Sequence, residues 1–302
     1  METTSTLDPA TLAQSRARAR VVADFAELVK ARLTLLVLVT TAVGFYLGSP
    51  GEVVPLALFH VVFGTALAAA GAAALNQWWE RQHDGLMQRT KGRPIPAGRM
   101  LARDALVLGG TLSLGGVIYL ALACNWLSAT LAALTIAIYI FGYTPLKRLS
   151  TTNTLVGAIP GALPPMIGWA AARGTIEWPA WSLFAIMFCW QMPHFFAIAW
   201  MYREDYARAG FRMLSGSDLD GGRVGRQSVC FAALLVLASS LPALLGLSSR
   251  TFLAVELLAG IGFLALAVRF HAQRDVPRAR QLFLASIVYL PVLLGLLVST
   301  KS

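Results

Sequence analysis

The sequence predicts an all-α, polytopic membrane protein: a bundle of about nine transmembrane helices around a central cavity, with a polar cap of cytoplasmic loops. Of its 302 residues, 57% are hydrophobic and only 13% are charged, whereas soluble domains carry roughly 25% charged residues. Apolar runs long enough to cross a hydrocarbon core of about 30 Å recur through the chain. These runs do not alternate with polar residues, which favours helices over the strands of a membrane barrel.

The apolar runs place the spans along the chain. They are expected at about Leu33–Leu47, Val53–Trp78, Asp104–Ala123, Trp126–Tyr143, Leu155–Ala172, Trp178–Trp200, Gln227–Leu247, Thr251–Phe270 and Leu282–Val298. Residues 1–32 are expected to form a disordered, polar cytoplasmic segment, and residues 33–302 a single membrane-embedded domain. The fifth span is rich in glycine and proline. This predicts a kinked helix that lines a cavity, because such breakers persist in lipid only where neighbours satisfy the backbone.

The distribution of positive charge predicts the orientation of the spans. With the N-terminus in the cytoplasm, 22 of the 25 lysine and arginine residues lie in cytoplasmic segments, and the exceptions are Arg173, Arg250 and Lys301. This is the bias of the positive-inside rule. The loops after spans two and six are then cytoplasmic, the C-terminus is outside, and the expected location is the cell inner (plasma) membrane. Orientation explains the net charge of +10, so no nucleic-acid partner is expected.

Three oxygen-bearing side chains, Asn76, Glu80 and Asp84, recur every fourth residue where the second span ends. On a helix this spacing stacks them along one face, and Mg²⁺ takes such oxygen ligands together with substrate phosphates. The next loop adds cations at Arg89, Lys91 and Arg93. Carboxylates beside cations indicate a metal-bound diphosphate, which binds both. The alternative is a solvated helix end followed by a positive-inside loop.

A second charged cluster, Glu204, Asp205 and Arg208, follows the sixth span on the same side of the membrane. Two acidic clusters on one side of a bundle could hold metal ions on either side of one diphosphate; the alternative is ordinary loop charge. Lys147 and Arg148 close the fourth span. They either add cations to the diphosphate site or only anchor the topology.

His194 lies inside the sixth span, about a turn and a half from its cytoplasmic end. An ionisable residue within a span is a functional candidate, and imidazole is a good iron ligand; the alternative is a hydrogen bond between helices. His60 and Glu256 lie at similar depth near the outer surface, where they can face each other, and no role is assigned to them. The three cysteines have no metal-ligand spacing and are interpreted as small apolar fillers.

From about Lys30 to the C-terminus, the chain resembles the UbiA-type intramembrane prenyltransferase superfamily. Five segments carry the resemblance: N-x-x-x-E-x-x-x-D-x-L-M-x-R-T-x-x-R-P-I-P-x-G (Asn76–Gly98), Y-T-P-L-K-R (Tyr143–Arg148), G-A-I-P-G-A-L-P-P-M-I-G-W (Gly157–Trp169), W-Q-M-P-H-F (Trp190–Phe195) and Y-R-E-D-Y-x-x-A-G-x-x-M-L (Tyr202–Leu214). The middle three resemble the branch that farnesylates protohaem IX, the haem O synthases, more than the quinone and chlorophyll branches.

The resemblance implies a Mg²⁺-dependent enzyme that joins the farnesyl group of farnesyl diphosphate to a vinyl group of haem B. Water is added, and the products are haem O and diphosphate. Haem B is then a substrate and not a cofactor. The product would supply a downstream haem A synthase or a terminal oxidase, and membrane lipid surrounds the protein.

The resemblance also implies roles for the candidate residues. The expected catalytic metal ligands are Asn76, Glu80 and Asp84, with Asp205 and Glu204 at a second position. The residues expected to bind the diphosphate are Arg89, Lys91, Arg93, Lys147, Arg148 and Arg208. Arg208 could instead bind a haem propionate, and His194 is expected to bind the haem.

Three positions depart from the superfamily pattern. Glu80 stands where aspartate is usual, Ala209 interrupts a second D-x-x-x-D motif, and Ser215 replaces an expected proline. The second departure weakens the expectation of a second metal. Two other functions remain open: a prenyltransferase acting on a quinone precursor or chlorophyllide, and a transporter. Transporters place ionisable residues near mid-membrane, whereas these carboxylates gather at one surface, which favours an enzyme.

Overall fold

The structure, a computed structural model, describes residues 9–302. Within that range it is an all-α protein in which nine helical segments are long and apolar enough to cross a membrane. They are α2 (Ala31–Gly48), α3 (Pro55–Asp84), α4 (Ala102–Ala123), α5–η1–α6 (Trp126–Ala137, Ile138–Tyr143, Thr144–Leu149), α7–α8 (Asn153–Ala162, Pro164–Arg173), α9 (Trp178–Met201), α12 (Gly222–Leu244), α13 (Arg250–Gln273) and α14 (Val276–Ser299). The nine predicted spans are therefore confirmed.

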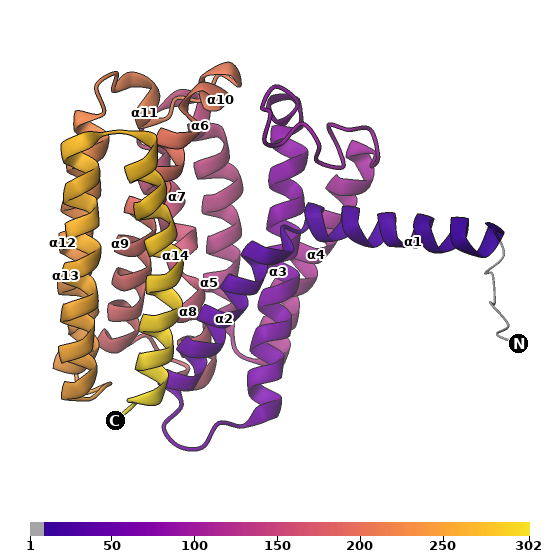
Figure 1. The fold of residues 1–302 in the computed structure, drawn as a ribbon. Coiled ribbons are helices and arrows are strands. Elements are labelled where there is room, and N and C mark those ends of the chain that lie inside the picture. The colour runs from indigo at the N-terminus through magenta and orange to yellow at the C-terminus, as the bar shows by residue number, and fades with distance from the viewer. Residues whose placement is uncertain (1–8) are drawn as a thin grey trace, which may run out of the picture.

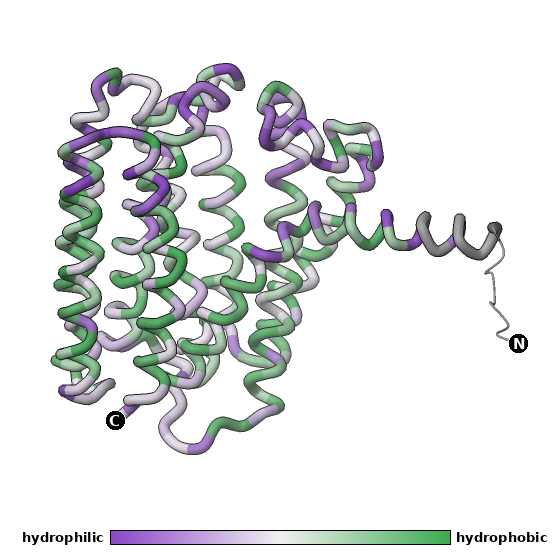
Figure 2. The backbone as a smooth tube through the Cα atoms, in the orientation of Figure 1, coloured by the Kyte–Doolittle hydropathy of each residue, from purple (hydrophilic) through white to green (hydrophobic). Residues whose placement is uncertain are grey.

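The spans run side by side, and the two longest segments between them, residues 85–101 and 202–221, lie at the same end (Figure 1). The short connections 150–152 and 274–275 lie there too, and the segment 202–221 contains the short helices α10 (Arg203–Arg208) and α11 (Leu214–Ser217). We call this end, uppermost in Figure 1, the basic end. Figure 2 shows hydrophilic residues concentrated in its loops and hydrophobic residues along the helix bodies. The cytoplasmic location of this end stays a prediction.

The first helix, α1 (Pro9–Leu28), corrects the expectation of disorder over residues 1–32, of which residues 1–8 lie outside the described part. It lies across the direction of the spans and projects from the bundle (Figure 1). Gln77 Nε2 donates to its last carbonyls, those of Glu27 and Leu28, at 2.7 and 2.9 Å. Arg99 forms an ion pair with Asp24 at 2.8 Å. These contacts hold the C-terminal end of α1, residues 24–28, against α3 and the loop that follows it.

Two of the spans are irregular. The fifth is divided at Leu163 into α7 and α8, directly before Pro164 and Pro165, so the predicted kink is present. The prolines remove backbone donors and clash with the preceding turn. The fourth passes through a π-helical segment, η1, just before Pro145. Such segments often occur at functional sites.

Close helix contacts depend on glycine. A Cβ added to Gly168 on α8 would lie 1.9 Å from the Thr41 carbonyl oxygen on α2, and one added to Gly44 would lie 2.0 Å from that of Pro165. A Cβ added to Gly71 on α3 would lie 2.3 Å from the backbone nitrogen of Ser113 on α4. Small residues let membrane helices approach until their backbones touch, and van der Waals packing then stabilises the pair.

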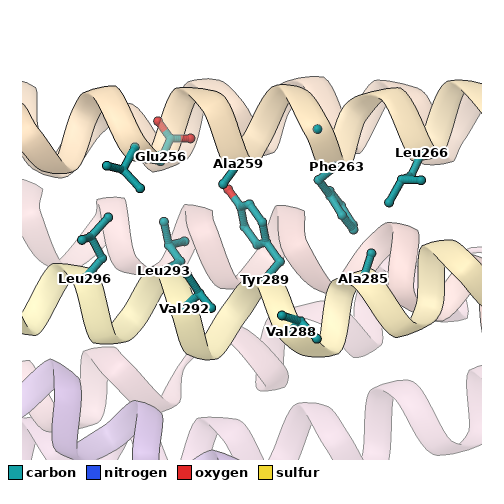
Figure 3. Close-up of a pocket in the computed structure, with 12 residues that line it drawn as sticks. Glu256, Ala259, Phe263, Leu266, Ala285, Val288, Tyr289, Val292, Leu293 and Leu296 are labelled. Carbon is teal, nitrogen blue, oxygen red and sulfur yellow. The ribbon is translucent and has the colours of Figure 1, made fainter.

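A groove of about 470 Å³ lies between α13 and α14 (Figure 3). Its walls are almost wholly apolar, and its polar residues are Glu256 and Tyr289. Glu256 lies 3.3 Å from the Ser240 hydroxyl on α12. His60 instead contacts the Tyr119 hydroxyl on α4 at 2.7 Å. The expectation that His60 and Glu256 face each other is therefore wrong, because each ties its own helix to a different neighbour.

The glycine contacts give the first prediction. Gly168→Ala should lower the thermal stability of the detergent-solubilised protein by about 1–3 kcal/mol, because the new methyl group overlaps the α2 backbone. Gly115→Ala on α4 is the matched control, since nothing lies within 4 Å of its added Cβ. Equal melting temperatures for the two variants would show that α2 and α8 do not depend on this contact.

Candidate functional site

The acidic motif lies on the last turns of α3, at the basic end. The helix continues to Asp84, beyond the predicted end at Trp78, so Asn76, Glu80 and Asp84 do share one helical face. All three are buried, with exposed fractions of 0%, 5% and 0%. Polar side chains at this burial need partners inside the protein. The hydrogen-bond partners of these three side chains therefore determine which ligands the site can bind.

Each motif residue is bound by a different cation from a different part of the chain. Lys30 Nζ donates to Asn76 Oδ1, Lys147 Nζ to Glu80 Oε1, and Arg93 to Asp84 Oδ2, each at 2.6 Å. Charge-assisted bonds of this length are among the strongest in proteins. Three cations therefore converge on one helix face, which is the arrangement required to bind a polyanion.

Lys30 is a site residue that the sequence analysis missed, because it was counted only as a charge before the first span. It lies in the turn between α1 and α2, in a left-handed conformation with φ of 48°. Its ammonium also donates to the Tyr139 hydroxyl at 3.1 Å. Burial, together with the neighbouring positive charges of Arg93 and Lys147, lowers the pKa of Lys30 to about 7. Desolvation is the larger cause, and the carboxylates of Glu80 and Asp84 oppose this shift of the pKa.

An aromatic wall adjoins the cations. Tyr139 and Tyr143 on η1 stack with their ring centroids 5.7 Å apart, and Lys147 Nζ lies 4.5 Å from the Tyr143 ring. The hydroxyl of Thr144, the next residue, accepts a hydrogen bond from Asn76 Nδ2 at 3.0 Å. The π-helical segment thereby presents two aromatic faces beside the motif. Such faces stabilise positive charge.

The structure brings the second cluster to the first loop. Asp205 Oδ2 accepts from the backbone N–H of Arg89 at 3.3 Å, and its other oxygen pairs with Arg208 at 3.1 Å. The Arg89 guanidinium donates to the Tyr206 hydroxyl at 3.1 Å and lies over the Tyr202 ring. Asp205 therefore fastens the two loops together, with its charge already compensated by Arg208.

Three of the predicted site residues are not brought into this network. Lys91, Arg148 and Glu204 are exposed. Within residues 9–302 their side chains form no ion pair or hydrogen bond. Their roles as diphosphate or metal contacts stay predictions.

The oxygen set fits Mg²⁺ in chemical type, because the ion prefers carboxylate and carbonyl oxygens. Asp84 Oδ1 is buried without a hydrogen-bond partner, so it is a ready ligand. Asn76 Oδ1 and Glu80 Oε1 are instead bound to lysines. Within the described residues no three His, Cys, Asp or Glu side chains form a metal-ligand group. A metal would thus take up Asp84 directly and the other oxygens by exchange with the lysines.

His194 lies deeper along α9, about 10 Å from its end at Met201 by the helical rise of about 1.5 Å per residue. Its Nδ1 is 2.7 Å from the Ser286 hydroxyl on α14. The ring is half-buried and stacks on Trp190, with the centroids 5.2 Å apart. His194 therefore belongs to the interior of the bundle, apart from the charged cluster.

Comparisons with known proteins agree on one family. The model of the UbiA prenyltransferase family matches residues 37–290. A protein of Solibacter usitatus named "Protoheme IX farnesyltransferase" is 47% identical over 283 residues, covering 91% of this chain and 97% of the relative. A mitochondrial protein of the same name from Arabidopsis thaliana is 38% identical over 278 residues, covering 91% and 64%.

Solved structures share the fold. A digeranylgeranylglyceryl phosphate synthase structure has a TM-score of 0.78 at 15% identity, covering 92% of this chain and 98% of that one. A UbiA homologue from Archaeoglobus fulgidus bound to DMAPP and Mg²⁺ has a TM-score of 0.64 at 14% identity, covering 91% and 99%. At these identities the likeness concerns the fold.

The buried Lys147–Glu80 pair gives the second prediction. Lys147→Met should destabilise the protein by about 3–5 kcal/mol, because the Glu80 carboxylate stays buried without its cation. The double variant Lys147→Met/Glu80→Gln removes both charges and should recover most of the loss in thermal unfolding. A double variant as unstable as the single one would show that the two groups are not coupled.

Proposed function

The chain belongs to the UbiA prenyltransferase family, and on that premise we propose that it joins the farnesyl group of farnesyl diphosphate to a vinyl group of protohaem IX. Water is added in the same reaction, and haem O and diphosphate are released. The relatives that carry the name protohaem IX farnesyltransferase support the choice of acceptor. The observation that carries the diphosphate chemistry is the convergence of three cations on the buried acidic motif.

Diphosphate binding proceeds by an exchange of partners. Lys147 and Arg93 are paired with the Glu80 and Asp84 carboxylates, whereas Lys30 donates to the neutral amide oxygen of Asn76. A metal-bound diphosphate would offer each cation an anionic oxygen in place of its present partner. Bound Mg²⁺ supplies Lewis acidity and neutralises charge on the leaving group. Asn76, Glu80 and Asp84 would hold the metal through their oxygens, and Lys30, Lys147 and Arg93 would then donate to phosphate oxygens. Asp205 keeps the Arg89 loop in place over the site.

The cations then assist departure of diphosphate. As the C–O bond of farnesyl diphosphate breaks, negative charge develops on the diphosphate oxygens, where preorganised donors are most effective. Positive charge develops on the allylic carbon, beside the Tyr139 and Tyr143 rings. The haem vinyl group attacks this carbon and forms the new C–C bond. The cation left next to the pyrrole ring takes up water and loses a proton, which gives the hydroxyl group.

The second substrate is proposed to lie against His194, in the apolar interior below the charged cluster. An apolar setting suits both the farnesyl chain and the porphyrin face, and it excludes water from the allylic cation until the vinyl carbon has reacted. The chain is a multi-pass membrane protein. We propose that its basic end faces the cytoplasm from the inner membrane, and that haem O passes to a haem A synthase or a terminal oxidase.

Turnover tests the proposal. The purified protein is incubated in detergent with haem B, farnesyl diphosphate and Mg²⁺, and the porphyrin is analysed by mass. The expected product is heavier by a farnesyl group plus water and is absent when EDTA is added. Unchanged haem, with transfer instead to a phenolic acid offered in parallel, would preserve the metal site and contradict the choice of acceptor.

Asp84→Asn gives the third prediction. The amide keeps the shape of the side chain but removes the charge that the metal and Arg93 both require, so turnover should fall by about 100-fold or more. The control is Asp104→Asn, an exposed carboxylate whose only described ion pair, with Arg103, is 3.7 Å long. If Asp84→Asn turned over as fast as Asp104→Asn, Asp84 would not be a metal ligand.

A further inference from the structure

The imidazole of His194 is bound on one side and open on the other. Its Nδ1 contacts Ser286 Oγ at 2.7 Å. Its Nε2 forms no hydrogen bond with the described residues and is not among the buried polar atoms that lack a partner, so it reaches an accessible surface inside or beside the bundle. A histidine whose role is only to link two helices would not require an accessible Nε2.

The Ser286 hydroxyl decides which nitrogen carries the proton. Ser286 Oγ lies 2.6 Å from the backbone carbonyl oxygen of Phe283. A carbonyl oxygen cannot donate, so the serine proton lies in this bond. The Oγ lone pair is then left to accept from His194, which places a proton on Nδ1. In the neutral imidazole Nε2 therefore carries a lone pair, and the apolar surroundings favour that neutral form.

The ring is also fixed in orientation. Trp190 stacks on it nearly parallel, at 25°, and Phe283 lies at 4.9 Å between ring centroids. Trp190 Nε1 donates to the backbone carbonyl of Ser286 at 2.8 Å, so the same residue of α14 positions both rings of α9. Ser286 is fully buried. The direction of the Nε2 lone pair is thus set by packing as well as by the hydrogen bond.

We propose that His194 Nε2 is the axial ligand of the iron in the protohaem substrate, and that Ser286 is the positioning residue that keeps this nitrogen unprotonated and correctly directed. This rests on the proposed function, because only a haem acceptor brings iron to the site. Histidine that ligates a metal usually donates its other N–H to a fixed acceptor, which sets the tautomer and raises the basicity of the ligating nitrogen. Here the acceptor is a serine hydroxyl that is itself fixed by a carbonyl.

Ligation would orient the porphyrin for the reaction. His194 lies about 10 Å along α9 from Met201, where the helix enters the loops of the basic end. An iron bound to His194 would therefore hold the porphyrin within the span, about two helical turns below those loops. A vinyl group at its edge could then approach the allylic carbon.

Haem binding without farnesyl diphosphate tests the proposal separately from turnover. Ferric protohaem IX is titrated into the full-length protein in detergent, and axial nitrogen ligation is followed by the Soret band and by electron paramagnetic resonance. His194→Gly should lose the nitrogen signature, and added imidazole should restore it by filling the vacated space. Ser286→Ala, with His194 still present, should weaken haem affinity about 10–100-fold.

Ser228→Ala is the matched control for Ser286→Ala. Ser228 is an equally buried serine whose hydroxyl donates to a backbone carbonyl, that of Val224, at 2.9 Å. Its removal should leave haem affinity unchanged. The proposal is wrong if Ser286→Ala and Ser228→Ala bind haem alike, or if His194→Gly retains the wild-type signature.

The assignment of the iron ligand and the proposed reaction can be contradicted separately. Wild-type protein that ligates haem through nitrogen but forms no haem O supports the ligand assignment and contradicts the proposed reaction. Wild-type protein that forms haem O with no nitrogen ligand on the iron overturns the assignment of His194 and leaves the reaction in place.

Discussion

The pairing of three half-buried cations with the buried acidic face of α3 is the interaction on which the site depends. Glu80 and Asp84 are buried opposite Lys147 and Arg93, and these ion pairs offset the large cost of desolvating a carboxylate. The same cations could not converge on one another without the carboxylates between them. Each set makes the other possible. The result is a cluster of paired groups, which we propose exchange their partners when a metal diphosphate binds.

This balance also explains why the cluster spans so much of the chain. Its cations come from the turn before α2, from the loop after α3 and from the end of the fourth span, so the site forms only when the helices have assembled. The π-helical segment η1 also takes part, because its Tyr139 hydroxyl accepts a hydrogen bond from Lys30 at 3.1 Å.

Much of this could be predicted from the sequence. Hydropathy and charge bias gave the nine spans, and the four-residue spacing gave the shared face of Asn76, Glu80 and Asp84. Local patterns could not show Lys30, because its role depends on the turn that α1 makes against Gln77. The role of Ser286 could not be predicted either, because a serine in an apolar span has no recognisable function until its neighbours in space are known. Lys91 and Arg148 were included by proximity in sequence, and the structure leaves them exposed.

Equilibrium binding of a non-ionisable farnesyl diphosphate analogue, measured with Mg²⁺ and again with EDTA, tests the exchange of partners most directly. Tight binding is expected only with Mg²⁺, because the metal must bind the Glu80 and Asp84 carboxylates before Lys147 and Arg93 can donate to the phosphates. Equally tight binding in EDTA would contradict this expectation. The diphosphate would then be bound by cations that never leave the acidic motif.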